Sequence, residues 1–124
     1  MEKKEMTVLL IEPEARPKVV TMETGLKPLQ EAVGGYIEAV YPFDDPVALV
    51  CNEEGKLLNL PMCRSLHEAE DIICGSFFIC GAPADAENFT SLTSEQMKRY
   101  EERFHFPEVF LPVSNKGVFV LSCQ

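Results

Sequence analysis

The chain lacks the long hydrophobic run that a membrane span needs. Its apolar segment nearest the N-terminus, Val8–Ile11, ends at Glu12 and Pro13, whereas a membrane-spanning helix takes about 20 predominantly apolar residues. A secretory signal is also missing, because its apolar region needs roughly 7–15 residues. We therefore expect a cytoplasmic protein that does not associate with membranes.

Positive charge is scarce as well. The chain has 11 Lys and Arg residues against 20 Asp and Glu, which gives a net charge of -9 and a pI of about 4.6. Proteins that hold nucleic-acid phosphates have the opposite balance, so direct nucleic-acid binding is not expected. Short acidic groups recur at Asp44–Asp45, Glu53–Glu54, 67–71 and Glu101–Glu102. They form either a solvated surface or an acidic face that docks on a basic partner or mimics nucleic acid.

Paired cysteines of the C-x-x-C type are absent. The five cysteines are Cys51, Cys63, Cys74, Cys80 and Cys123. Structural zinc sites bring their ligands in closely spaced pairs, so these spacings fit a metal site badly, and Cys63 with His67 is the one plausible ligand pair. We expect no metal and no cofactor, and cysteines that act as small buried hydrophobes.

Catalytic motifs are missing too. The chain has two His and no nucleophile elbow, phosphate loop or zinc-binding helix. The glycines Gly34 and Gly35 follow a predicted helix, whereas a phosphate loop precedes one. The sequence therefore gives no positive indication of an enzyme.

What is present indicates one small α+β domain with a mainly antiparallel sheet and two helices packed on it. A chain of 124 residues with 46% apolar residues can bury its own core. We read residues 1–124 as this single domain, with residues 1–6 frayed and residues 107–124 as a C-terminal extension that contains a possible extra strand.

Strands are predicted where short apolar segments are bounded by turn residues. They cover residues 7–13, 18–23, 35–42, 46–51, 56–60, 71–81 and 117–122. Asn52 begins and Gly55 ends a tight turn that makes 46–60 the best hairpin signal. Residues 71–81 are apolar on both faces, which predicts a central strand that is covered on both sides.

Two helices are predicted from capping signals and hydrophobic spacing. In the first, Leu26, Leu29 and Val33 share a face and Gly34 supplies a left-handed C-cap. The second begins at Thr93, which with Gln96 three residues later makes a capping box. Its buried stripe is predicted to be Met97, Tyr100 and Phe104.

The segment 52–66, NEEGKLLNLPMCRSL, holds an amide and a guanidinium in an otherwise apolar stretch. In one interpretation Arg64 pairs with an acid such as Glu38 or Glu68, and Asn59 bonds the loop backbone. In the other, both side chains face a pocket in which the guanidinium binds a carboxylate or phosphate. Both interpretations stay open at this point.

Four segments in order resemble a known family: LKPLQEAVGGYIEAV, NEEGKLLNLPMCR, IICGSFFICG and SLTSEQMKRYEERF. Together they cover about Val8 to Phe106 and resemble domain-of-unknown-function family 3846. Its members look like cargo of phages and conjugative elements in Gram-positive gut bacteria, so the resemblance implies a context and no activity. The family loop is similar to LP-x-Asn-Arg, and here Cys63 takes the Asn position.

The leading hypothesis is a non-catalytic accessory protein of a mobile element that binds a protein partner or a small anionic ligand through residues 59–64. Its candidate contacts are Asn59, Arg64, Glu38 and Asn52. One alternative is an acidic, antirestriction-like decoy of DNA. Another is a small nucleotide-directed hydrolase with Arg64 as phosphate clamp and Glu38 or a loop acid as base. The protein is expected to be a monomer, or a homodimer formed by an edge strand or the C-terminal strand.

Overall fold

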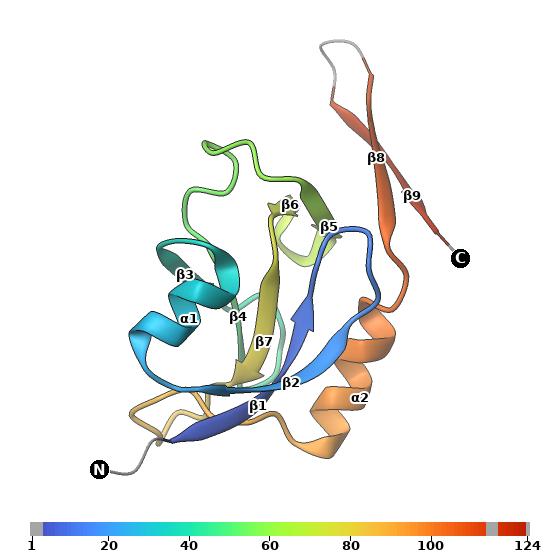
Figure 1. The fold of residues 1–124 in the computed structure, drawn as a ribbon. Helices are drawn as coiled ribbons and strands as arrows, with labels where there is room; N and C mark the ends of the chain where they lie inside the picture. The colour runs from blue at the N-terminus through green and yellow to red at the C-terminus, as the bar shows by residue number, and fades with distance from the viewer. Residues whose placement is uncertain (1–3, 114–116, 124) are drawn as a thin grey trace.

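The computed structural model describes residues 4–113 and 117–123, and its centre is a five-stranded antiparallel sheet (Figure 1). The sheet has the strand order β2-β1-β7-β4-β3. Its strands are β1 (Glu5–Ile11), β2 (Lys18–Glu23), β3 (Ile37–Val40), β4 (Val47–Asn52) and β7 (Phe77–Gly81). The α+β class and the mainly antiparallel sheet are thereby confirmed.

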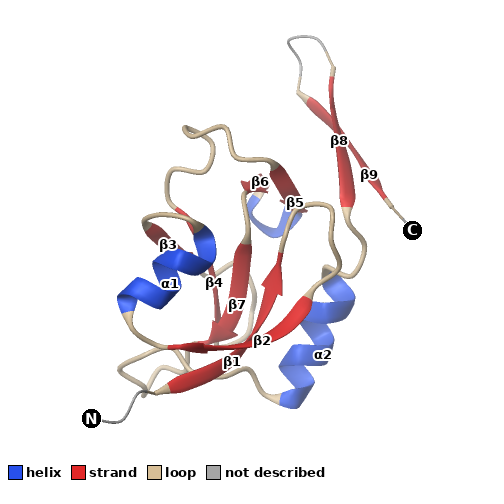
Figure 2. Ribbon diagram, viewed as in Figure 1, coloured by secondary structure: helices blue, strands red, loops and turns tan. Residues whose placement is uncertain are grey.

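Two smaller strand pairs and two helices complete the domain (Figure 2). The pairs are β5 (Met62–Leu66) with β6 (Asp71–Cys74), and β8 (Glu108–Pro112) with β9 (Val118–Ser122). A 3-10 turn, η1 (His67–Ala69), joins β5 to β6. Helices α1 (Leu26–Val33) and α2 (Ser94–Arg103) lie on either side of the sheet. Neither helix, nor any other in the described part of the chain, is long and apolar enough to cross a membrane.

Strand β7 is the middle of the core, as its double-sided apolar pattern predicted. Phe78 and Cys80 join the cluster that α1 covers, while Phe77 and Ile79 join the cluster on the α2 side. Every residue of β7 is buried. Alternate side chains of a strand point to opposite faces. The apolar residues of β7 therefore pack on the α1 side and on the α2 side of the same sheet.

Both helices begin or end at the predicted caps. The Thr93 side chain accepts a hydrogen bond from the Gln96 backbone N–H, and the Gln96 side chain accepts one from the Thr93 N–H, which completes the capping box. Gly34 adopts the left-handed C-cap with a φ of 79°. The predicted stripe of α2 is confirmed by buried Tyr100 and Phe104, but in α1 the prediction was wrong for Leu26, which is 60% exposed.

The predicted hairpin over residues 46–60 was wrong. Residues 53–59 form consecutive turns in which Leu58 N–H donates to the Glu54 carbonyl at 2.9 Å and Leu60 N–H to the Gly55 carbonyl at 3.0 Å. These local bonds occupy the groups that a strand would offer to a neighbour. Strand β4 instead pairs with β3 and β7, and the next strand begins only at Met62, after Pro61.

The apolar segment 71–81 forms two strands, where the sequence predicted one. Gly75 lies between β6 and β7 with a φ of 87°, a left-handed conformation that glycine adopts without strain. A Cβ at this position would approach the Leu60 side chain to 2.8 Å. The chain therefore leaves the small pair β5–β6 at Gly75 and enters the central sheet as β7.

The ends of the domain differ from the prediction in extent. Residues 1–3 lie outside the described residues, but Glu5 and Met6 belong to β1 and Met6 is only 1% exposed, so fraying to residue 6 was wrong. The extra C-terminal strand is confirmed as β9, and it pairs with β8, which was not predicted.

Candidate functional site

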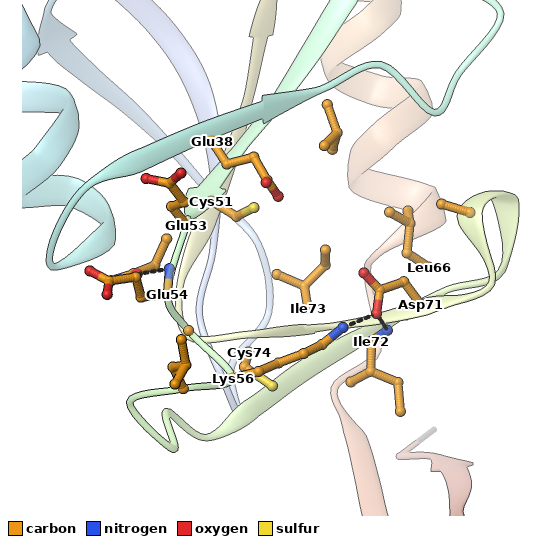
Figure 3. Close-up of a pocket in the computed structure, with 15 residues that line it drawn as sticks. Glu38, Cys51, Glu53, Glu54, Lys56, Leu66, Asp71, Ile72, Ile73 and Cys74 are labelled. Carbon is orange, nitrogen blue, oxygen red and sulfur yellow. Dashed lines mark hydrogen bonds and ion pairs between the residues drawn. The ribbon is translucent and has the colours of Figure 1, made fainter.

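A cavity of about 230 Å³ opens between the β3–β4 edge of the sheet and the β5–β6 pair (Figure 3). The turn after β4 closes one side of it. Its lining combines four acidic side chains and one lysine with thiol and aliphatic groups. The lining residues are Glu38, Val40, Cys51, Asn52, Glu53, Glu54, Gly55, Lys56, Leu57, Leu66, Ala69, Asp71, Ile72, Ile73 and Cys74.

The carboxylates of Glu38 and Asp71 approach the cavity from opposite walls. Glu38 comes from β3, where it lies opposite Cys51 of β4, and Asp71 opens β6. Figure 3 shows both side chains directed into the space, while Glu53 and Glu54 stand at the turn and point away from its middle. The acidic groups that face a guest are thus Glu38 and Asp71.

Asp71 is neutralised by a neighbour, and Glu38 is not. The Lys56 ammonium donates to the Asp71 carboxylate. Burial by itself would raise the pKa of Asp71, but the hydrogen bonds from Lys56 and from the Ile72 N–H outweigh it and leave that pKa lowered. No ion pair joins Glu38 to another residue within the described ranges. Its exposed carboxylate is therefore the acidic group that faces the cavity without a directly bound cation.

The thiols in the wall are poor nucleophiles. Burial, reinforced by the charges of Glu38 and Asp71, raises the pKa of Cys51 to about 11. Burial likewise raises the pKa of Cys74. Both thiols are therefore protonated at neutral pH, and the thiolate is the reactive form of cysteine. Cys51 and Cys74 therefore act as small apolar residues in the wall of the cavity.

Asn52 reaches the cavity from the end of β4 but uses its amide inside the protein. Its Nδ2 donates to the Val33 carbonyl at 3.1 Å, and its Oδ1 accepts from the Glu54 N–H at 2.8 Å. The side chain thereby joins the C-terminal end of α1 to the turn that follows β4. Asn52 is only 6% exposed, so it shapes the wall and leaves little of its amide for a guest.

Arg64 lies outside the cavity and is 1% exposed. Its Nε and Nη2 donate to the Phe104 carbonyl at 3.2 and 3.1 Å, and Nη2 also donates to Ala15. Nη1 donates to the carbonyls of Cys63 and, at 3.5 Å, Glu12. These bonds use all five N–H groups of the guanidinium.

The acceptors of Arg64 are main-chain carbonyls, not the carboxylates of Glu38 or Glu68 that one interpretation of the sequence assigned to it. Glu68 is bound by Arg103 at 2.8 Å. Phe104 caps the C-terminal end of α2, where the helix dipole favours a cation. Arg64 therefore connects β5, the β1–β2 loop and α2, and this arrangement does not favour its use as an anion clamp.

Asn59 stands apart from both groups. It is exposed, has a φ of 58°, and lies in the turns before β5. Asparagine tolerates this left-handed conformation better than most residues, which accounts for its place in the turn. Of the four predicted contacts, the structure brings Glu38 and Asn52 to one cavity, while Asn59 and Arg64 lie elsewhere. Arg64, the phosphate clamp of the hydrolase alternative, does not line the cavity that Glu38 faces.

Lys56, Asp71 and Ile73 were not recognised as site residues from the sequence. The acidic groups at 53–54 and 67–71 were the available signal, because each flanks one wall of the cavity. What the sequence could not show was that β5–β6 folds back against the β3–β4 edge.

Cys63 and His67, the plausible metal pair, do not meet. The Cys63 thiol is fully buried and lies 3.7 Å from the Ile11 carbonyl, whereas the His67 side chain is exposed and contacts Arg103. Among the residues that the structure describes, no group of three His, Cys, Asp or Glu side chains could hold a metal ion. Position 63 faces the core, where the Cys63 side chain is fully buried.

Comparison with known proteins places the chain in a family. Residues 6–105 match the family described as Domain of unknown function (DUF3846). The chain belongs to this family. The match ends near the end of α2, so the β8–β9 pair lies beyond it. Searches among curated proteins and among solved structures give no significant match.

Proposed function

We propose that this member of the DUF3846 family is a non-catalytic accessory protein of a mobile element that binds a protein partner by taking a basic side chain into the acidic cavity. The observation that carries the proposal is the Glu38 carboxylate, which has no ion-pair partner among the described residues and faces the cavity (Figure 3). Lys56, the lysine in the described lining, is already paired with Asp71. A lysine or arginine of the partner would complete the charge balance.

The sign of the charge favours a cationic guest over the anionic ligand that the sequence suggested. An anion in this cavity would meet the carboxylates of Glu38 and Asp71, and the charge of Lys56 is already offset by Asp71. Arg64, the cation that was expected to attract an anion, is occupied by five carbonyl contacts. Carboxylates at a recognition site repel an anionic ligand and so oppose its binding.

The size of the cavity favours a side chain over a larger metabolite. Pockets for drug-sized ligands measure about 300–1,000 Å³, and this one measures about 230 Å³. Leu66 and Ile73 in its wall suit the aliphatic stem of a lysine or arginine, which packs on apolar surface while its charged end reaches a carboxylate.

The biological context of the proposal comes from the family resemblance, which links such proteins to phages and conjugative elements. In that setting we place the protein in the bacterial cytoplasm. A net charge of -9 disfavours direct contact with nucleic acid and favours basic protein surfaces. The protonated thiols of Cys51 and Cys74 support the non-catalytic reading.

The test is a titration of isotope-labelled protein with N-acetyl-lysine methylamide, followed by backbone amide NMR. We expect shifts to cluster in residues 52–57 and 71–74, and the glutamate analogue to produce none. Glu38→Gln should weaken binding about tenfold, because hydrogen bonds to charged groups contribute on the order of 1.5–3 kcal/mol. Glu31→Gln, an exposed acid on α1, is the matched control and should bind like wild type.

Two results would contradict the proposal. The glutamate analogue could bind better than the lysine analogue, or the shifts could map away from the cavity. If instead a basic protein binds equally well to wild type and Glu38→Gln, and the affinity falls steeply with salt, the acidic-decoy alternative is favoured, because such binding uses the whole surface.

A further inference from the structure

Strand β3 is an edge of the central sheet and has a neighbouring strand on one side only. Among the described residues it pairs with β4 and with no other strand. Its residues, Ile37–Val40, are half-buried or exposed, whereas every residue of β4 is buried. An edge strand presents a row of unpaired N–H and C=O groups, to which another chain can add as a further strand.

One hydrogen bond at the end of β3 shows which of its backbone groups point outward. The Glu53 N–H donates to the Tyr36 carbonyl at 2.8 Å, so the backbone groups of Tyr36 face β4. In an antiparallel pair, residues that bond to the neighbouring strand alternate with residues that do not. The backbone groups of Glu38 therefore also face β4, and those of Ile37 and Ala39 point outward.

The side chains of β3 alternate between two environments. Ile37 and Ala39 pack against the core cluster that α1 covers, while Glu38 points from the other face into the acidic cavity (Figure 3). A strand added outside β3 sets one residue directly opposite Glu38, on the cavity face. Because Glu38 bonds inward, that residue forms a non-hydrogen-bonded pair with it. The Cα atoms of such a pair lie only about 4.5 Å apart, which brings the two side chains close together.

We infer that β3 is the docking strand for the partner, an inference that rests on the proposed function. An extended segment of the partner pairs antiparallel with the outer edge of β3 and sets a lysine or arginine opposite Glu38. Main-chain hydrogen bonds to Ile37 and Ala39 supply affinity, and the basic side chain supplies specificity. Tyr36 and Tyr41 flank the strand and are 65% and 64% exposed, and tyrosine is enriched at protein interfaces.

Charge selects a basic segment of another protein over a second copy of this chain. Two β3 edges paired with each other would bring together two bodies of net charge -9, each with its own Glu38. Like charges on directly opposed strand residues are destabilising, whereas opposite charges there are favourable. Glu38 has no ion-pair partner among the described residues, so a basic residue opposite it gains an attraction that no residue of the domain already uses.

The other edge of the sheet, β2, does not offer the same complementarity. It begins directly after Pro17, and its first residue, Lys18, pairs with Glu12 at 2.7 Å. Lysine and proline on an edge strand are common protections against the addition of a further strand. The four residues of β3 include no Lys, Arg or Pro. Of the two edges, β3 is therefore the one that suits a basic segment.

The test uses the peptide acetyl-Thr-Val-Lys-Val-Thr-amide and backbone amide NMR of the full chain. In the expected register the lysine lies opposite Glu38, and the two valines bond to Ile37 and Ala39. Hydrogen bonding protects an amide proton from exchange with solvent. We expect the amide protons of Ile37 and Ala39 to exchange at least about tenfold more slowly with the peptide bound. N-acetyl-lysine methylamide, which cannot form the strand, should leave their exchange unchanged.

Two N-methylated peptides make a matched pair of probes on the wild-type protein. Methylation of a valine backbone nitrogen removes a donor that points to β3 and sets a methyl group against the strand, so binding should weaken at least about tenfold. Methylation of the lysine backbone nitrogen blocks an N–H that points away from β3. That peptide should bind like the unmodified one.

The outcomes separate this inference from the proposed function. Equal effects of the two methylations, or unchanged exchange at Ile37 and Ala39, would overturn the inference, and the proposed function would stand if the lysine analogue still shifts the cavity residues. Equal protection by a peptide with threonine in place of lysine would contradict both, because no basic side chain is then required. Protection that appears without peptide as the protein concentration rises would assign the edge to a second copy and overturn the inference.

Discussion

Arg64 and Glu38 are two charged residues with opposite surroundings. Arg64 is buried and has a protein partner for each of its N–H groups, while Glu38 is exposed and has no ion-pair partner among the described residues. Arg64 therefore has no N–H donor left for a ligand, whereas the carboxylate of Glu38 can still bind one. Arg64, whose charge stands out in an apolar stretch of the sequence, therefore holds the structure together. Glu38, which the sequence marks less clearly, faces the cavity.

The largest effect is expected from Arg64→Leu. The substitution leaves the carbonyls of Phe104, Ala15 and Cys63 without their donor, and each buried unsatisfied polar group costs about 1–3 kcal/mol. The free energy of unfolding should fall by roughly 3 kcal/mol or more. Urea denaturation measures this, with Arg16→Leu at an exposed position as the control. A loss equal to that of the control would refute the structural assignment of Arg64.

Asn52→Ala should give the next largest effect. It removes the bond to the Val33 carbonyl and the acceptor for the Glu54 N–H, so we expect a loss of about 2 kcal/mol in unfolding free energy. The measurement is again urea denaturation. If Asn52 acted mainly on a guest, the stability would hold and only binding of the lysine analogue would change.

The Lys56–Asp71 pair should contribute less than about 1 kcal/mol, because it is largely exposed and screened by solvent. Its contribution depends on pH in a defined direction. The folded-state pKa of Asp71 is lowered below 3.8, so the contribution is present above about pH 4 and is lost as the pH falls through the lowered pKa. Asp71→Asn should therefore destabilise the protein slightly at pH 7 and less at pH 2, as thermal unfolding would reveal. An equal destabilisation at both pH values would contradict the ion-pair account.

The smallest effect on stability is expected from Glu38→Gln. Glu38 is exposed and forms no ion pair within the described part of the chain, and surface substitutions of this kind change stability by no more than about 0.5 kcal/mol. The same variant should weaken binding of the lysine analogue about tenfold, so the two measurements separate. A destabilisation comparable to that of Asn52→Ala would mean that Glu38 is structural after all.

How far the sequence predicted the structure depended on the range of the interactions. The capping box at Thr93 and Gln96, the C-cap at Gly34 and the double-sided burial of β7 all follow from residues close together in the chain, and all were predicted. The hairpin after β4 failed because the turn bonds of residues 53–59 competed successfully with strand pairing. Strand β8, which pairs with β9, was not predicted.

The candidate site was predicted only in part, for the same reason. Glu38 and Asn52 were named from the sequence, but the opposite wall of the cavity, with Asp71 and Ile73, comes from a strand pair whose position the local pattern does not contain. A small anionic ligand was one of the expectations, and it rested on the interpretation in which Arg64 faces a pocket.

By itself the sequence determined the α+β class, the central place of the 77–81 segment, the helix ends and the acidic balance of the chain, since composition, hydrophobic period and capping act over a few residues. Only the tertiary structure decided the role of Arg64 and the site of Glu38. The acceptors of Arg64 lie 40 residues away at Phe104 and 49 residues away at Ala15, and no local pattern carries partners at that distance. The sequence does not show whether a charged residue is buried or exposed, because that depends on which distant groups the folded chain brings beside it.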